Sequence, residues 1–290
     1  MDRVLAIKID LSQEGRSIKD ILRNDLRVSA AILTQLKKEK DGILLEGNPV
    51  FATERVKAGE TLQVTIRDGV SPMAGTKLPL SVLYEDEDVI VLNKPRSMPT
   101  HPSQNHHEDT LANGLMGYFK GQNFIFRAIT RLDKDTSGVV LVAKNPLAGA
   151  VLVEDMKLGR IQKEYVAITN GAPDPSKGRV EAPIRRQKES IVLRCVSPDG
   201  REALTRYETV KKEESLALVR LIPLTGRTHQ LRVHMSYLGC PIYGDDLYGA
   251  PQKDEATRLH CGKLRFFQPV TGEEILVEAP LPEDMTSLVK

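Results

Sequence analysis

The sequence predicts an α+β fold with a mixed, largely antiparallel sheet, flanking helices and a small α/β module at its N-terminal end. Residues 190–222 contain strand-like runs joined by turn residues at Pro198-Asp199-Gly200, the pattern of antiparallel hairpins. The apolar run 139–143, the helix start at Asn145-Pro146 and a strand over 161–168 indicate one strand–helix–strand unit. With 290 residues, 40% of them hydrophobic, the chain can form one large core and a small second domain.

The N-terminal region has the pattern of a compact module followed by a linker. Strands near its two ends, residues 4–11 and 62–66, enclose two helical patterns, and Ser29 is a plausible cap for the second. Turn-forming residues without periodicity fill positions 69–79. We therefore predict a module over residues 1–68, a linker over 69–79 and a second domain over 80–290.

The second domain is expected to alternate between strands and helices. Side chains alternate along a strand, so Lys163 and Tyr165 should share one face. Thr228 is a plausible cap for a helix that ends at Gly239. The predicted elements are two strands within 80–95, a helix over 110–119, a strand over 139–143, a helix over 146–159, a strand over 161–168, strands within 190–222, a helix over 228–239 and final strands over 259–267 and 275–279.

Composition and charge narrow the class of protein. No apolar run approaches the ~18 residues that a membrane-spanning helix needs, and the first residues lack the shape of a signal peptide. Three widely spaced cysteines indicate ordinary reduced thiols, so we expect a cytoplasmic protein. The net charge is only +2, yet residues 127–235 carry 20 basic and 13 acidic groups. This basic region fits a polyanionic partner, and an ordinary solvated surface explains it equally well.

Three separated stretches carry candidate functional residues. Residues 131–138 mix charges, hydroxyls and a glycine just before a buried strand, where a rigid scaffold can present a carboxylate. Taken alone, that stretch is more simply a salt-bridged turn. Tyr165 lies in the second stretch and Arg227, just before a helix, in the third. Their simpler explanations are an ordinary strand aromatic and a capping or surface arginine.

The histidines do not form a convincing metal site. His106 and His107 stand beside carboxylates, but in a proline-bounded loop instead of on ordered elements. His229 and His234 are five residues apart, which is not the spacing of a helical metal pair. We therefore predict no metal, and structural or RNA-facing roles for His229 and His234.

The three stretches together resemble the motifs of the RluA-type pseudouridine synthases, which isomerise uridine to pseudouridine within structured RNA. The motifs are Arg131-Leu132-Asp133, Lys163-Glu164-Tyr165 and the run 226–234, and the run 88–95 fits the family as well. Residues 12–66 resemble the S-four-type (alpha-L) RNA-binding module, although their second helix ends in lysines where that family is usually rich in arginine. The resemblance implies the pseudouridine synthase fold for the second domain.

The resemblance also implies a role for individual residues. Asp133 matches the essential catalytic aspartate, Tyr165 the tyrosine that stacks on the target base, and Arg227 the arginine that pairs with the aspartate. Arg131 matches the residue that helps to displace the target nucleotide from the RNA stack. The other residues expected to bind the substrate are Lys163, Gln230 and Arg232. Thr130 departs from the family, which usually has a histidine there, and this departure concerns local packing or substrate preference.

The implied function is isomerisation of specific uridines in structured RNA, with ribosomal RNA favoured over transfer RNA. The reaction neither oxidises nor hydrolyses, so no cofactor or metal is expected, and we expect a monomer. Asp133 could attack the anomeric carbon of the ribose or take its 2′ proton, and the sequence does not choose between these routes. A glycoside hydrolase would need two flanking carboxylates, and only Asp133 has a specific context. The stronger alternative is a non-catalytic RNA-binding or ribosome-assembly factor on the same fold.

Overall fold

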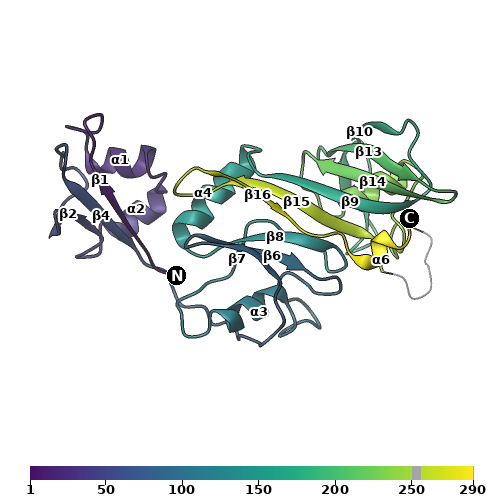
Figure 1. The fold of residues 1–290 in the computed structure, drawn as a ribbon, viewed down its shortest axis with the longest axis horizontal. Coiled ribbons are helices and arrows are strands. Elements are labelled where there is room, and N and C mark those ends of the chain that lie inside the picture. The colour runs from purple at the N-terminus through teal and green to yellow at the C-terminus, as the bar shows by residue number, and fades with distance from the viewer. Residues whose placement is uncertain (250–255, 290) are drawn as a thin grey trace.

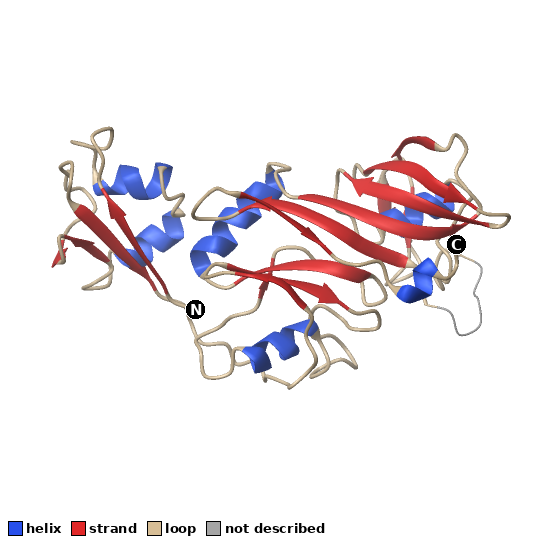
Figure 2. Ribbon diagram, viewed as in Figure 1, coloured by secondary structure: helices blue, strands red, loops and turns tan. Residues whose placement is uncertain are grey.

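The structure is a computed structural model and describes residues 1–249 and 256–289. A small antiparallel sheet lies in the N-terminal module, residues 1–68, and a larger mixed sheet runs through the rest of the chain (Figure 1, Figure 2). This arrangement confirms the predicted α+β class. Among the described residues, no helix is both long and apolar enough to cross a membrane.

The N-terminal module packs two short helices against its sheet. Its elements are β1 (Arg3–Lys8), α1 (Ile18–Asn24), α2 (Ala30–Leu36), β2 (Ile43–Leu45), β3 (Asn48–Pro49) and β4 (Thr61–Ile66). The strands lie in the order β1-β4-β2-β3. Side chains of Ser17 and Ser29 accept backbone hydrogen bonds at the starts of α1 and α2, so Ser29 caps its helix as predicted. A serine oxygen suits these positions because the first turn of a helix leaves its N–H groups without partners.

The main sheet is antiparallel except for one pair of strands. Its strands are β5 (Val82–Glu85), β6 (Val89–Lys94), β7 (Arg127–Ala128), β8 (Ser137–Ala143), β9 (Gln162–Asn170), β10 (Lys177–Glu181), β13 (Leu204–Lys212), β14 (Leu216–Pro223), β15 (Leu259–Phe267) and β16 (Glu274–Glu278). They follow the order β10-β13-β14-β9-β15-β8-β6-β5, with β16 beside β15 and β7 beside β8. A separate hairpin joins β11 (Ile184–Arg186) to β12 (Arg194–Val196). Every residue of β8 is buried, as its β-branched composition suits a central strand.

Four helices accompany this sheet in the described part of the chain. They are α3 (Leu111–Tyr118), α4 (Pro146–Lys157), α5 (Gln230–Tyr237) and α6 (Glu283–Thr286). Asn145 caps α4 through a hydrogen bond from the Ala148 N–H, with Pro146 at the first helical position. In the ribbon view α4 lies beside the N-terminal module. Helix α3 lies on the other side of β6 and β8 from α4 (Figure 1).

The prediction that Thr228 caps α5 is wrong. The helix begins at Gln230, and its N-cap is His229, whose φ of 56° lies in the left-handed region. The side chain of Gln230 accepts the Arg227 N–H at 3.0 Å, so this turn is closed by Gln230. The helix then ends at Tyr237, before Gly239, whose φ of 76° terminates it.

The strand–helix–strand unit is present, but its two strands are not neighbours. Strand β15 lies between β8 and β9, parallel to β8 and antiparallel to β9. Because of this inserted strand, α4 connects two antiparallel strands whose relative position depends on a segment from much later in the chain. The ends carrying Asp133 and Tyr165 are therefore brought together by β15, and direct pairing of β8 with β9 plays no part.

Candidate active site

Asp133 lies on a loop that neighbouring side chains hold by its backbone. Thr100 donates its hydroxyl to the Leu132 carbonyl at 2.9 Å in a buried contact. On the other side of Asp133, the Lys94 ammonium donates to the Lys134 carbonyl at 2.9 Å. Neither bond uses the carboxylate, so the loop is fixed while the Asp133 side chain stays available.

Lys94 is fully buried, which is unusual for a lysine. Besides Lys134, its ammonium group donates to the carbonyls of Pro95 and Met98, at 2.9 and 2.8 Å. Burial lowers the pKa of Lys94 to about 7, and the charges of Asp135 and Asp133 act against that shift. The sequence showed Asn93-Lys94-Pro95 ending a strand, but gave no sign that the lysine reaches the catalytic loop.

The structure supplies a reason for Thr130. This residue is buried, and its hydroxyl accepts the Leu141 N–H of β8 at 2.9 Å. The Leu141 carbonyl in turn accepts the N–H groups of Ile129 and Thr130. A threonine at this position therefore joins the loop to the central strand through a satisfied buried hydrogen bond.

Gly138 sets how closely the loop approaches the neighbouring strand. Its φ is 111°, and a Cβ at this position would lie 2.2 Å from the Cys261 carbonyl oxygen. Gly138 pairs with Cys261 across β8 and β15, and Cys261 pairs with Tyr165 across β15 and β9. Gly138, Cys261 and Tyr165 thus lie in one row across β8, β15 and β9, and the loop of Asp133 leads into this row.

The Asp133 carboxylate is partly buried, and its charge is felt by four other functional groups. Its charge acts on the pKa values of Lys94, Tyr165, His229 and Arg232. In the described part of the chain, the Asp133 side chain makes no ion pair and no hydrogen bond within the protein. A carboxylate that is held in place but not committed to a protein partner can react with a substrate.

Tyr165 presents an uncharged ring next to Asp133. Only 6% of the residue is exposed, and burial raises the pKa of Tyr165 well above its ordinary value. The Cys261 thiol beside it is also buried, which raises the pKa of Cys261 to about 12. Both groups are therefore neutral at physiological pH.

The charge of Asp133 acts on the pKa of Arg232, and the pairing of Asp133 with Arg227 stays a prediction. The Nε of Arg227 donates to the Glu202 carbonyl at 2.8 Å, and no ion pair of the described residues joins Arg227 to Asp133. Burial acts to lower the pKa of Arg232, but hydrogen bonds to Asp245 and the charges of Asp245 and Asp133 raise it overall. Because α5 begins at Gln230, two residues later than predicted, Arg232 lies in its first turn.

Arg232 is held by its own carboxylate partners. Its Nε and a terminal nitrogen donate to the two oxygens of Asp245, at 2.8 and 2.6 Å, and the guanidinium lies 5.3 Å from the Tyr248 ring centre. Tyr248 also contacts His229, with 2.7 Å between its hydroxyl and Nδ1. Burial lowers the pKa of His229, and the nearby Asp133 opposes this shift. Arg232 and His229 therefore form one fixed wall of the site.

Gln230 has a structural role, which differs from the predicted substrate contact. Its amide oxygen accepts from the Arg227 N–H and the Thr225 hydroxyl, and its amide nitrogen donates to the Leu204 carbonyl and the Thr205 hydroxyl. Because these four bonds use its hydrogen-bonding groups, none is left for RNA. His234 is also structural: its ring nitrogens contact the Thr205 hydroxyl and the Ala182 carbonyl, at 2.9 and 3.0 Å.

The remaining predicted substrate residues differ in exposure. Arg131 is exposed on the loop beside Asp133, and its charge acts with burial to lower the pKa of His101. Lys163 is only partly exposed, and burial lowers its pKa while Cys261 acts against the shift. Arg131 is thus free to meet a polyanion, whereas Lys163 lies against the sheet near Tyr165.

Comparisons with known proteins identify the family of the chain. The profile of the RNA pseudouridylate synthase family matches residues 88–237, just over half of the chain. A Bacillus subtilis protein described as the uncharacterized RNA pseudouridine synthase YjbO is 38% identical over 271 residues, which cover 92% of this chain and 96% of that protein. Ribosomal large subunit pseudouridine synthase D of Vibrio cholerae is 36% identical over 310 residues, which cover 98% of this chain and 95% of that one.

A solved structure shows the same fold at 30% identity. Human RNA pseudouridylate synthase domain containing 1 matches with a TM-score of 0.61 over 71% of this chain and 85% of the human chain. The matched profile includes the loop of Asp133, the strand of Tyr165 and the first turn of α5. The chain therefore belongs to the RNA pseudouridylate synthase family and is an RNA pseudouridine synthase, an isomerase.

Proposed function

We propose that this enzyme isomerises specific uridines of large-subunit ribosomal RNA, with Asp133 as its catalytic residue. The observation that carries the catalytic assignment is the Asp133 carboxylate. Its loop is fixed, no described residue forms an ion pair or hydrogen bond with it, and its charge acts on Tyr165 and Arg232. The choice of ribosomal RNA is supported by relatives from Vibrio cholerae and Xanthomonas campestris, which are described as ribosomal large subunit pseudouridine synthase D.

The reaction requires one carboxylate and a place for the base to turn. The bond from uracil N1 to the ribose C1′ breaks, the base rotates and C5 bonds to C1′. C5 then loses its proton and N1 gains one, so the composition of the nucleotide is unchanged. Asp133 can either bond to C1′ for the duration of the rotation or take the 2′ proton of the ribose. In both routes the neighbouring Arg232 stabilises the negative charge of the carboxylate form.

Tyr165 is suited to hold the rotating base. Its high pKa keeps the phenol neutral, which favours stacking and disfavours a role as a phenolate base. Stacking of a base on an aromatic ring contributes about 1–3 kcal/mol. Extruding the nucleotide from the RNA costs a few kcal/mol, and contacts from exposed Arg131 and the basic region 127–235 offset it.

A comparison of Asp133→Asn with Asp135→Asn tests the proposal. RNA labelled with tritium at uridine C5 releases tritium when pseudouridine forms, and pseudouridines in ribosomal and transfer RNA are mapped in cells carrying each variant. We expect Asp133→Asn to release no tritium while RNA binding survives, and Asp135→Asn, two residues along the same loop, to retain activity. Full activity of Asp133→Asn would contradict the catalytic assignment.

The mapping also separates this proposal from a non-catalytic assembly factor. If cells without the protein lose no pseudouridine, the assembly-factor function is favoured. Loss of a transfer RNA site alone would move the substrate from ribosomal to transfer RNA. We further propose that the enzyme works as a cytoplasmic monomer, which agrees with a reaction that needs only the residues of one chain around Asp133.

A further inference from the structure

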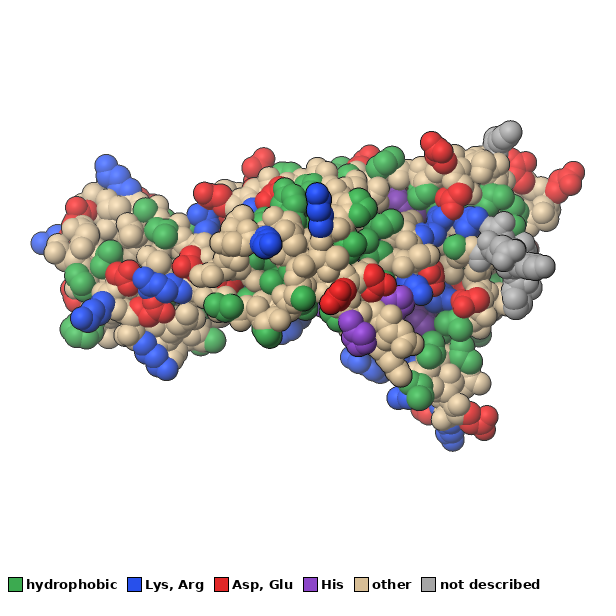
Figure 3. Space-filling view, turned by 90° about the horizontal axis from the view of Figure 1, so that it is seen from below, with side chains coloured by type: hydrophobic (Ala, Val, Ile, Leu, Met, Phe, Trp, Pro, Cys, Tyr) green, Lys and Arg blue, Asp and Glu red, His purple; other side chains and the backbone are tan. Residues whose placement is uncertain are grey.

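His229 carries a functional group that the reaction described above leaves unused. It is the N-cap of α5, three residues before Arg232, and it is partly exposed. The charge of Asp133 acts on the pKa values of both His229 and Arg232. In the space-filling view, histidine side chains lie next to acidic and basic ones on the surface of the catalytic domain (Figure 3). His229 therefore belongs to the group of side chains around Asp133.

The backbone at His229 is held in a strained conformation. Its φ of 56° and ψ of 19° lie in the left-handed region, which few residues other than glycine adopt. Such conformations persist only where the surrounding structure holds them, and they are concentrated at functional sites. Here the Gln230 side chain closes the turn, and the His229 carbonyl accepts the Val233 N–H at 2.9 Å. The direction in which the His229 side chain leaves the backbone is therefore set by the fold.

Tyr248 fixes the imidazole ring of His229. The Tyr248 hydroxyl lies 2.7 Å from Nδ1, and the two rings meet edge to face with 5.6 Å between their centres. Tyr248 is held in turn by its own neighbours. Its hydroxyl accepts the Arg194 N–H at 2.9 Å, its N–H donates to Asp245 at 3.1 Å, and its ring lies against the Arg232 guanidinium. The imidazole therefore has one orientation.

These contacts decide which ring nitrogen of His229 carries the proton. Burial lowers the pKa of His229, so the imidazole is neutral at physiological pH, with one donor and one acceptor nitrogen. The Tyr248 hydroxyl already accepts the Arg194 N–H, so its own proton is directed to Nδ1. We therefore assign the ring proton to Nε2. Within the part of the chain that the structure describes, Nε2 makes no hydrogen bond, so its N–H is a fixed donor that is free for a substrate.

The isomerisation creates a charge that such a donor would stabilise. When the bond from N1 to C1′ breaks, its electron pair leaves with uracil, and the negative charge spreads over N1 and the carbonyl oxygens O2 and O4. The anion then uses its electrons to bond C5 to C1′. Once C5 has lost its proton and N1 has gained one, the base is neutral again. Fixed hydrogen-bond donors aimed at a charge that develops during a reaction lower the barrier strongly.

We propose that the Nε2–H of His229 donates a hydrogen bond to a carbonyl oxygen of the target uracil and stabilises the anion that forms when the glycosidic bond breaks. This inference rests on the proposed function. A neutral donor suits uracil, which is neutral before the bond breaks, whereas the charged Arg131 suits a phosphate. His229 is then a catalytic residue, and Tyr248 is a positioning residue that holds its ring.

Single-turnover kinetics test the donor, on large-subunit ribosomal RNA transcribed with tritium at uridine C5. His229→Gly removes the side chain, and glycine adopts the left-handed backbone without strain, so the variant should fold. We expect it to lower the rate constant of tritium release by about a hundredfold or more, as the loss of one oxyanion donor does. The Kd for the RNA should not change. His229→Asn is a second variant that keeps a residue tolerant of this backbone and should show the same loss.

An unchanged rate constant in both variants would overturn the inference. A loss confined to Kd would also overturn it, because such a loss marks a contact that is equally strong before and after the bond breaks.

A double-mutant cycle tests whether Tyr248 acts through His229. Tyr248→Phe keeps the ring against Arg232 but removes the hydroxyl, and we expect it to lower the rate constant about threefold to tenfold. In the His229→Gly background it should have no further effect. Tyr118→Phe is the matched control, because it removes a hydroxyl that donates to Glu85 on the surface and should leave the rate constant unchanged. Equal effects of Tyr248→Phe in both backgrounds would contradict the positioning role.

Sulfur substitution in the base tests the contact from the side of the RNA. Sulfur is a weaker acceptor than oxygen, so synthetic RNAs with 2-thiouridine or 4-thiouridine at the mapped target weaken one carbonyl contact at a time. Product is measured by chromatography of the nucleosides. At one of the two positions, the loss caused by His229→Gly should be smaller than on uridine. An equal loss on all three RNAs would overturn the inference.

Asp133→Asn in the same assays separates this inference from the proposed function. Activity of Asp133→Asn would contradict the proposed function. An inactive Asp133→Asn together with a fully active His229→Gly would contradict this inference alone.

Discussion

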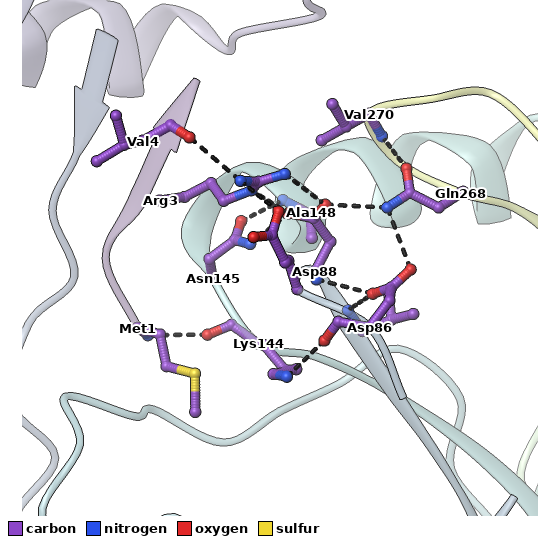
Figure 4. A network of polar contacts seen from close by, with 12 residues as sticks. Met1, Arg3, Val4, Asp86, Asp88, Lys144, Asn145, Ala148, Gln268 and Val270 are labelled. Atoms are coloured by element: carbon purple, nitrogen blue, oxygen red, sulfur yellow. Dashed lines mark hydrogen bonds and ion pairs between the residues drawn. The ribbon is translucent and has the colours of Figure 1, made fainter. Parts of the chain in front are cut away.

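The domain boundary and the active site use the same residue type in opposite ways. At the boundary between the module and the catalytic domain, Asp68, Asp88 and Asp155 are each buried and each bound by both oxygens to an arginine of the other part (Figure 4 shows Asp88 with Arg3). At the active site, Asp133 is only partly buried and, within the described residues, its carboxylate makes no ion pair. Arg232, whose pKa the charge of Asp133 acts to raise, is already committed to Asp245.

The difference shows how the fold separates stability from chemistry. A buried carboxylate needs a fixed cation, because burying a charge without a partner is costly. A reactive carboxylate must instead keep its oxygens free, so its loop is held through backbone groups, by hydrogen bonds with Thr100, Thr130 and Lys94. Substitutions that act on one side of this division should leave the other side intact.

The same substitution at the two sites is expected to have opposite effects. Asp133→Asn should lower activity by about a thousandfold or more, because it removes the reacting carboxylate, with the free energy of unfolding unchanged within about 0.5 kcal/mol. Asp155→Asn should retain activity on a short stem-loop and lose about 1–3 kcal/mol of stability, because charged hydrogen bonds to Arg27 are lost. Tritium release and urea unfolding of both variants check this prediction. Equal losses of activity in the two variants would contradict the separation between a catalytic and a structural aspartate.

Gly138→Ala should damage both properties. The new Cβ would meet the Cys261 carbonyl at 2.2 Å in a backbone conformation that alanine resists, so we expect a loss of several kcal/mol and of most activity. Gly159→Ala is the matched control, since Gly159 also has a positive φ, of 69°, but has open space around it. That change should cost only about 1 kcal/mol. Comparable unfolding midpoints for the two variants would show that the backbone of β15 at Cys261 can shift to relieve the clash.

Thr130→Val should have a smaller effect. Valine keeps the shape of threonine but cannot accept the Leu141 N–H, and a buried donor left without a partner costs about 1–3 kcal/mol. Thr130→Ser keeps the hydroxyl and should remain close to the wild type in stability. If the valine and serine variants unfold at the same temperature, the hydrogen bond does not hold the loop to β8.

Lys94 should make the stability depend on pH. Burial lowers its pKa to about 7 from the ordinary 10.5. Above pH 7 the folded protein loses this proton while the unfolded chain keeps it, so the contribution of Lys94 to the free energy of unfolding rises with pH in that window. Urea unfolding of wild type and Lys94→Met between about pH 6 and pH 9 checks this. The wild type should gain on the variant above pH 7, and a constant difference would exclude the titration.

The local patterns of the chain were enough to predict the fold class, the helix caps at Ser29 and Asn145, and the motif loop of Asp133. These features depend on residues close in sequence, so propensity and turn chemistry reveal them. Whether Arg227 or Arg232 acts with Asp133 could not be decided in this way. Both belong to the same motif, and their positions depend on where α5 begins, at a turn that the Gln230 side chain closes.

The same limit applies to Lys94 and to the arginine–aspartate pairs at the domain boundary. Asn93-Lys94-Pro95 reads as a strand end, and nothing local shows that its ammonium group reaches a carbonyl 40 residues away. Arg27 and Asp155 are 128 residues apart and look like ordinary surface charges in the sequence. Long-range partners of charged groups follow from how the elements pack, which no short stretch records.

The position of β15 has a consequence for the order in which the enzyme becomes active during synthesis. Loop residues around Asp133 and the strand of Tyr165 leave the ribosome long before residues 259–267, which join them. Until that strand is made, Gly138 and Tyr165 lack their common neighbour, and the sheet has two separate halves. A growing chain therefore carries the catalytic motifs without a catalytic site. Late closure of this kind delays activity until translation of the catalytic domain is nearly finished.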